Sequence, residues 1–128
     1  MIKMDFFTGS CLCGNVSITI NGPIEHVIHC HCRMCQKSHG SSYASFGLVR
    51  KENITIRAND SISSYRSSIS VTRSFCRKCG SNIEWNDNSN YNSKYRSFSL
   101  GLLDSEFSPS SEEHIFMTEH PLWDKSSD

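Results

Sequence analysis

The sequence lacks an excess of charge of either sign, because 13 basic residues are balanced by 13 acidic residues. A general nucleic-acid-binding protein needs a basic patch or tail to meet the phosphate backbone. The only local concentration of basic residues is formed by Arg73, Arg77 and Lys78. The composition therefore argues against nucleic acid as a partner.

Long hydrophobic runs are also missing, and no stretch approaches the length of a membrane span. Near the amino terminus, Lys3 and Asp5 interrupt the apolar positions, so these residues do not resemble a secretion signal. We expect no membrane partner and a cytoplasmic location. With 128 residues and no internal repeat, residues 1–128 are expected to form a single domain, and nothing indicates an oligomeric state.

A sustained apolar repeat of helical period is absent, and the pattern favours a mainly β fold. Apolar and polar residues alternate as in half-buried strands, and residues 63–75 fit two strands around a turn. Only residues 33–39 favour a helical turn. The other strands are expected at residues 16–20, 43–49, 54–56, 83–85, 98–102 and 115–117, and polar loops at 86–94 and 108–113.

What the sequence does contain is seven cysteines in three close clusters. They are Cys11-Leu-Cys13, Cys30-His-Cys32-Arg-Met-Cys35 and Cys76-Arg-Lys-Cys79. Thiolates two or three positions apart can turn toward one point, as a tetrahedral zinc ion requires. Four thiolates close a structural zinc site, whereas three leave a coordination position open for chemistry.

The natural partition of the seven cysteines is therefore four and three. The expected closed site uses Cys11, Cys13, Cys76 and Cys79, and the expected open site uses Cys30, Cys32 and Cys35. Gly14 and Gly80 each directly follow a cysteine of the first set, where a positive φ lets backbone amides curl toward the thiolates.

Three other uses of the cysteines remain open at this point. Disulfides are disfavoured by the odd count and by the absence of a visible secretion signal. Unrelated buried thiols would not explain three clusters of close spacing. An iron–sulfur cluster is possible in principle, but the spacing of Cys30, Cys32 and Cys35 matches neither common ferredoxin pattern.

The motifs at 9–14 (Gly-Ser-Cys-Leu-Cys-Gly), 30–37 (Cys-His-Cys-Arg-Met-Cys-Gln-Lys) and 75–81 (Phe-Cys-Arg-Lys-Cys-Gly-Ser) have a specific order and spacing. Together they resemble the glutathione-dependent formaldehyde-activating enzyme (GFA) family, which includes centromere protein V. Gly-Leu-Leu-Asp at 101–104 and His-Ile-Phe at 114–116 are similar to the downstream segments of that family.

The resemblance implies a zinc-stabilised β-tent made of short antiparallel sheets with little helix. It implies two Zn²⁺ ions per chain, with a structural ion on the four-cysteine set and a catalytic ion on the three-cysteine set. The implied activity is that of a carbon–sulfur lyase, which forms or cleaves a thiol–aldehyde adduct such as S-(hydroxymethyl)glutathione. The implied partners are a small thiol such as glutathione and a small aldehyde such as formaldehyde.

Several residues outside the clusters are candidates for the site. We expect the His31 side chain to point away from the metal, because His31 lies between two proposed ligands. Arg33, Lys37 and Arg50 could supply cations for the glutathione carboxylates, and Gln36 and Ser38 could donate hydrogen bonds to a ligand. Asp104 could orient a proton transfer, and Trp85 and Trp123 could wall a pocket. Each of these has an ordinary surface, capping, turn or core role as its alternative.

Two further functions compete with catalysis. His29 or His39 could act as a proton shuttle, or could complete the second zinc site. In the latter case both zinc ions would be structural, and the protein would be a non-catalytic binding module. A nucleic-acid or cytoskeletal adaptor is suggested by centromere protein V, but the balanced charge speaks against it.

Overall fold

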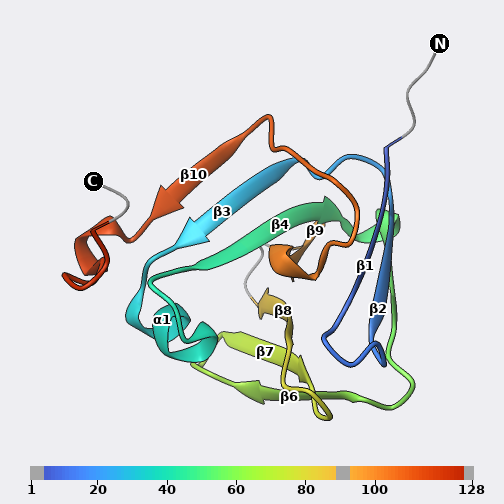
Figure 1. Cartoon of the computed structure of the whole chain (residues 1–128), viewed down its shortest axis with the longest axis horizontal. Coiled ribbons are helices and arrows are strands. Elements are labelled where there is room, and N and C mark those ends of the chain that lie inside the picture. Colours follow the sequence, from blue (N-terminus) through green and yellow to red (C-terminus); the bar gives the residue numbers. More distant parts are fainter. Residues whose placement is uncertain (1–4, 89–92, 126–128) are drawn as a thin grey trace.

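The computed structural model describes residues 5–88 and 93–125, which form two β-sheets and one short α-helix (Figure 1). The smaller sheet has the strand order β1 (Phe6–Ser10), β2 (Ser17–Asn21), β5 (Ile54–Arg57). The larger sheet has the order β10 (Glu112–Ile115), β3 (His26–Cys30), β4 (Ala44–Arg50), β9 (Tyr95–Ser99), β8 (Asn82–Asp87), β7 (Val71–Cys76), β6 (Ile62–Arg66). The helix α1 (Arg33–His39) connects β3 to β4, and three 3-10 turns are η1 (Lys51–Asn53), η3 (Leu100–Leu102) and η4 (Met117–Glu119).

The expected mainly β fold of short sheets with little helix is confirmed. Neighbouring strands pair antiparallel with one exception among the described residues, since β10 runs parallel to β3. The segment 63–75 does contain two strands around a turn, and α1 spans the residues expected to be helical. Within the described part of the chain, no helix has the length and apolar character to cross a membrane.

The boundaries expected for some elements were wrong. The strand expected at 98–102 stops at Ser99, because the chain turns into η3 there. The last strand begins earlier than expected and covers Glu112–Ile115, so residues 112–113 of the expected second loop belong to it. The first expected loop begins within β8, and its residues 89–92 lie outside the described part. The pattern also missed β1 and β3 altogether.

The main core lies where the two sheets face each other. Val16, Ile18 and Ile20, which alternate with polar residues in the sequence, are almost fully buried there. They pack with residues of the larger sheet, including Ile83 and Phe98. A second apolar cluster, smaller than the first, contains Cys30, Cys35, Ala44 and Phe46.

Gly47 of β4 permits a close approach of its backbone to the core. A Cβ atom at this position would lie 2.6 Å from Cε1 of Phe98 and 3.2 Å from Cγ2 of Ile24. Both neighbours are buried, so neither can move aside freely. A side chain at position 47 would therefore overpack the core.

Replacing Gly47→Ala should lower the free energy of unfolding by about 1–3 kcal/mol, which is the usual cost of overpacking. Urea unfolding of the metal-loaded protein measures this difference. Gly101→Ala is the matched control, because a Cβ there has no neighbour within 4 Å. Equal stability of the two variants would show that the contact between Gly47 and Phe98 does not constrain the fold.

Candidate metal centres

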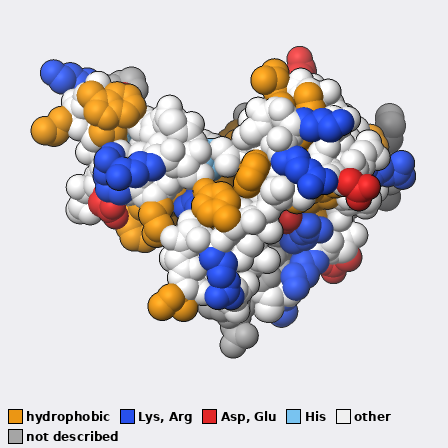
Figure 2. Space-filling view, turned by 90° about the horizontal axis from the view of Figure 1, so that it is seen from below, with side chains coloured by type: hydrophobic (Ala, Val, Ile, Leu, Met, Phe, Trp, Pro, Cys, Tyr) orange, Lys and Arg blue, Asp and Glu red, His pale blue; other side chains and the backbone are white. Residues whose placement is uncertain are grey.

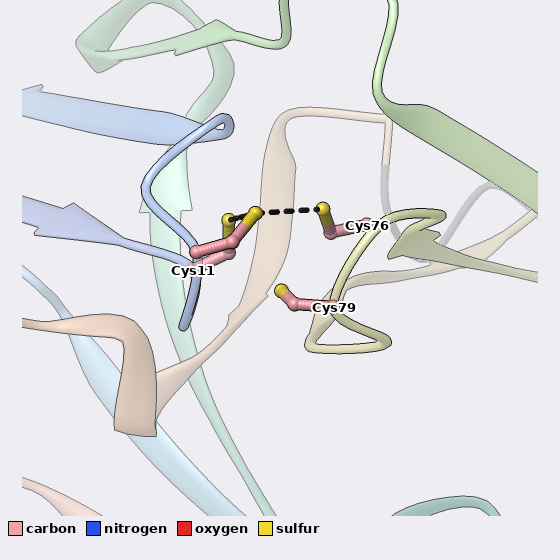
Figure 3. Close-up of side chains that lie close together, drawn as sticks. Cys11, Cys76 and Cys79 are labelled. Carbon is pink, nitrogen blue, oxygen red and sulfur yellow. Dashed lines mark hydrogen bonds between the residues drawn. The ribbon is translucent and has the colours of Figure 1, made fainter.

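The first cysteine set comes from two turns that belong to different sheets. Cys11 and Cys13 lie between β1 and β2, while Cys76 ends β7 and Cys79 follows in the turn before β8 (Figure 3). The four sulfurs all lie within 4.8 Å of one another. Sγ of Cys13 is 3.6 Å from Sγ of Cys11 and 3.7 Å from Sγ of Cys76.

These distances fit a tetrahedral metal ion. With a Zn–S bond of about 2.3 Å, the sulfurs of a tetrahedral site are about 3.8 Å apart. Without an ion, little attraction would hold four thiols together, because thiols form only weak hydrogen bonds. The chain therefore brings together four donors that could hold a metal ion, and thiolate donors suit zinc.

The two turns have the same backbone design. The amide of Gly14 donates to the carbonyl of Cys11 at 3.0 Å, and the amide of Gly80 donates to that of Cys76 at 2.7 Å. Both glycines have a positive φ, 85° and 82°, as the sequence predicted for a turn around a metal. Two matching turns therefore face each other across the sulfurs.

Neighbouring polar groups favour the thiolate form of two members of this set, Cys11 and Cys79. The amide of Val16 donates to Sγ of Cys11 at 3.2 Å. The side chain of Ser81 lies 3.3 Å from Sγ of Cys79 and lowers the pKa of that thiol to about 5. A metal ligand must be deprotonated, so these contacts prepare the set for binding.

The second set surrounds the start of α1. Cys30 ends β3, Cys32 is the N-cap residue of α1, and Cys35 lies in its first turn. Their sulfurs are also within 4.8 Å of one another. Contact with the Cys30 thiol and with Arg73 lowers the pKa of Cys35 to about 6, while the pKa of Cys30 is raised by Cys35. One thiolate in this trio is thus favoured even before a metal arrives.

Neither histidine proposed as a fourth ligand joins the trio. Among the described residues, no histidine nitrogen or carboxylate oxygen belongs to this group of converging atoms. His29 instead contacts Ser45 and Glu112. His39 packs edge-on against Phe46, and burial, followed by the charge of Arg73, lowers its pKa to about 4.

His31 points away from the sulfurs, as the sequence analysis expected. The residue is fully buried, and its Nδ1 and Nε2 lie 2.7 Å and 2.8 Å from Nδ1 of His120 and of His114. Burial lowers the pKa of His31, and the neighbouring histidines lower it further. A neutral imidazole that carries one proton can donate to one of these partners and accept from the other.

The segment after β9 holds the loop that carries the trio. The amide of His31 donates to the carbonyl of Ile115 at 3.0 Å. The side-chain amide of Gln36 donates to the carbonyls of His31 and Glu119. Gln36 is therefore a buried structural residue, and the suggestion that it binds a ligand or faces solvent was wrong.

Arg73 is a buried neighbour of the trio that was not among the candidate residues expected from the sequence. Only 3% of its surface is exposed, and its Nη2 donates to Sγ of Cys35 at 3.4 Å. Its Nε donates to Oγ of Ser67 at 3.0 Å. The available signal was its place two residues after the apolar Val71 in a strand, which puts both side chains on the same buried face.

A cavity of about 530 Å³ adjoins the trio. Its wall is one face of the larger sheet, where cross-strand partners such as Ile28 and Phe46 point the same way. Trp85 also lines it, as the sequence suggested. The lining comprises Ile28, Cys30, Cys32, Arg33, Met34, Cys35, Phe46, Leu48, Val71, Arg73, Trp85, Asp87, Ser97, Ile115, Phe116 and Glu119.

Other candidates lie elsewhere. Arg33 lines the cavity, but Lys37 and Arg50 do not, and Arg50 pairs with Glu25 at 3.4 Å. Asp104 accepts a hydrogen bond from Ser10 at 2.7 Å, and its amide donates to the carbonyl of Thr8 in β1. Two further candidates also lie outside the cavity lining, namely Ser38, whose hydroxyl is near that of Tyr65, and Trp123, which is 69% exposed.

Comparison with known proteins identifies the family. A sequence profile described as "Glutathione-dependent formaldehyde-activating enzyme" matches residues 6–119, so the chain belongs to this family. The resemblance stated from the cysteine motifs is confirmed for this family.

Individual relatives match this chain over shorter stretches than the family profile does. A protein of Aspergillus flavus named "Putative glutathione-dependent formaldehyde-activating enzyme" is 32% identical over 76 residues, which cover 57% of this chain and 40% of that protein. An uncharacterized lyase of Schizosaccharomyces pombe is 26% identical over 80 residues, 62% of this chain and 57% of that protein. The matched regions thus span about half of the length of these relatives.

A crystal structure of a Rhodobacter sphaeroides protein shares the fold. The TM-score is 0.62 at 18% sequence identity, and the superposition covers 78% of this chain and 90% of that chain. The similarity supports the arrangement of the sheets described above.

Removing the Arg73 guanidinium should loosen metal binding by the second set. In the Arg73→Met variant the negative charge of the trio loses its buried counter-charge, and affinity should fall about tenfold or more. Transfer of zinc to a coloured chelator measures the loss.

The control is Arg66→Met, since Arg66 is an exposed arginine on the neighbouring strand β6. Arg73→Lys should restore part of the affinity by keeping a cation near Cys35. If Arg73→Met released its metal no faster than Arg66→Met, the charge compensation would play no part in holding it.

Proposed function

We propose that the protein is a zinc-dependent carbon–sulfur lyase that forms or cleaves a thiol–aldehyde adduct. The observation that carries this proposal is the trio of converging thiols at the wall of a cavity, with no fourth ligand among the described residues. Membership of the GFA family supports the same reaction class. A small thiol and a small aldehyde are the proposed partners, and formaldehyde with glutathione is the pair that the family description names.

The proposal includes two zinc ions per chain with different tasks. Cys11, Cys13, Cys76 and Cys79 would fill all four positions of a structural ion. Cys30, Cys32 and Cys35 would hold the catalytic ion and leave one position for the substrate. We further propose that residues 1–128 act as one domain in the cytoplasm.

Bound at the trio, zinc would keep a substrate thiol deprotonated at neutral pH, so that its sulfur could attack the carbonyl carbon of an aldehyde. In this direction a carbon–sulfur bond forms, the carbonyl π bond breaks, and the thiol proton ends on the new hydroxyl oxygen. The reverse direction releases thiol and aldehyde without any change of oxidation state.

The chain's own residues support this chemistry in two ways. Arg73 places a buried positive charge against Sγ of Cys35 and offsets the negative charge of three thiolates. The side chains of Phe46 and Trp85 line the cavity with apolar surface, which limits the access of water to the reacting sulfur.

The Cys32→Ser variant tests the proposal. Serine is a good N-cap, so α1 should keep the cap that Cys32 now provides by accepting from the amide of Cys35. Loss of one thiolate should lower the rate of adduct exchange by about 100-fold or more, since a metal contributes several kcal/mol to such steps. Exchange NMR with ¹³C-formaldehyde measures the rate, with glutathione as the thiol in one series and phenylmethanethiol in another.

Lys37→Ala is the control, because Lys37 is an exposed residue on the same helix outside the cavity lining. Circular dichroism should show both variants folded. A folded Cys32→Ser protein that exchanges the adduct as fast as wild type would refute the lyase assignment.

A further inference from the structure

The cavity beside the second cysteine set is mostly apolar. Six strands of the larger sheet contribute side chains to the wall of the cavity. The hydrophobic side chains among them are Ile28, Phe46, Leu48, Val71, Trp85 and Ile115. Met34 and Phe116, which are 47% and 56% exposed, also line it. Figure 2 shows hydrophobic side chains grouped toward the middle of one face of the molecule, with Lys and Arg side chains around them.

The charged side chains of the lining do not favour an anion. Two are basic, Arg33 and Arg73, and two are acidic, Asp87 and Glu119. Glutathione carries two carboxylates and one ammonium group, so it is a net anion, and its binding would require a surplus of available cations. The cavity offers no such surplus.

Both arginines make internal contacts, but Arg33 is exposed and its guanidinium keeps further N–H donors. Arg73 donates to Cys35 and Ser67 from a position that is almost fully buried. The Arg33 guanidinium donates to Oε1 of Gln36, and the Arg33 amide donates to Oε1 of Glu119. Arg33 is the accessible cation of this lining, so one of the two glutathione carboxylates would lack a cationic partner or would have to break the contacts of Arg73, and both alternatives are costly.

We propose that the cavity selects a thiol whose substituent is an uncharged hydrocarbon or aromatic group, in preference to glutathione. This inference deepens the proposed function and rests on it for the reacting sulfur. The cavity volume of about 530 Å³ lies within the range of small-molecule sites, so it can enclose a substituent as large as a benzyl group. The sulfur would meet Cys30, Cys32 and Cys35, and the substituent would pack against Phe46 and Trp85.

Fluorescence of Trp85 provides a direct test. The chain has two tryptophans, and Trp123 is 69% exposed, so the Trp123→Phe variant leaves Trp85 as the reporter inside the cavity. The zinc-loaded variant is titrated with phenylmethanethiol, glutathione and benzyl alcohol. We expect phenylmethanethiol to bind at least about tenfold more tightly than glutathione, because its ring leaves water. Equal or tighter binding of glutathione would overturn the inference.

A pair of variants tests whether the cavity itself sets this preference. Ile28→Gln places a polar amide on the half-buried wall of the cavity. This change should weaken the binding of phenylmethanethiol severalfold while leaving the affinity for glutathione unchanged. Ile69→Gln is the control, because Ile69 is 92% exposed and lies outside the lining. If both variants bound phenylmethanethiol equally, the preference would come from elsewhere and the inference would fail.

Two further readouts separate this inference from the lyase proposal. If phenylmethanethiol and benzyl alcohol both bind more tightly than glutathione, and neither thiol adduct exchanges faster than in buffer, the apolar selectivity is supported and the lyase proposal fails. If the glutathione adduct exchanges faster at equal concentration than the phenylmethanethiol adduct, the lyase proposal stands and the selectivity is overturned.

Discussion

Four sulfurs from two turns converge at the point where the two sheets are joined. Cys13 and Cys76 are 63 positions apart, and their sulfurs lie 3.7 Å from each other. The turns belong to the two sheets, so an ion held here fixes the sheets together at the edge of their shared core. Four thiolates repel one another unless a cation neutralises them, and metal binding energy therefore becomes folding energy. A chain of 128 residues with 37% hydrophobic residues benefits from such a crosslink.

The second set uses the same chemistry with one ligand fewer, and its surroundings differ accordingly. Its residues lie at the junction of β3 and α1, where a helix cap, a buried arginine and a wall of apolar side chains meet. His114 of the parallel strand β10 and His120, which follows the turn η4, contact His31 and so pack against this junction. The structure thus separates a set of sulfurs that links the sheets from a set that faces a cavity. The family match is consistent with an enzyme, and the assignment of tasks to the two sets is the proposal built on this contrast.

Features that depend on neighbouring residues in the chain were predicted correctly from the sequence. The spacing within each cysteine cluster, the short helix at 33–39 and the two strands within 63–75 all follow from neighbouring residues, and each was found. The parallel pairing of β10 was not foreseeable, because it depends on a partner strand more than eighty positions away. In β3, His26 and His29 disturb the alternation that reveals other strands. The burial of Arg73 beside Cys35 was hidden as well, since its neighbours Arg77 and Lys78 made it resemble part of a surface charge cluster.

We propose that the seven cysteines hold two metal ions of unequal lability, and elemental analysis of the purified protein is the decisive experiment. We predict two zinc ions per chain, of which a mild chelator removes one. A Cys32→Ser, Cys35→Ser double variant should retain only the resistant ion, because the four-cysteine set supplies all of its ligands. One ion or none in the wild-type protein would refute this proposal, as would two ions of equal resistance that both survive in the double variant.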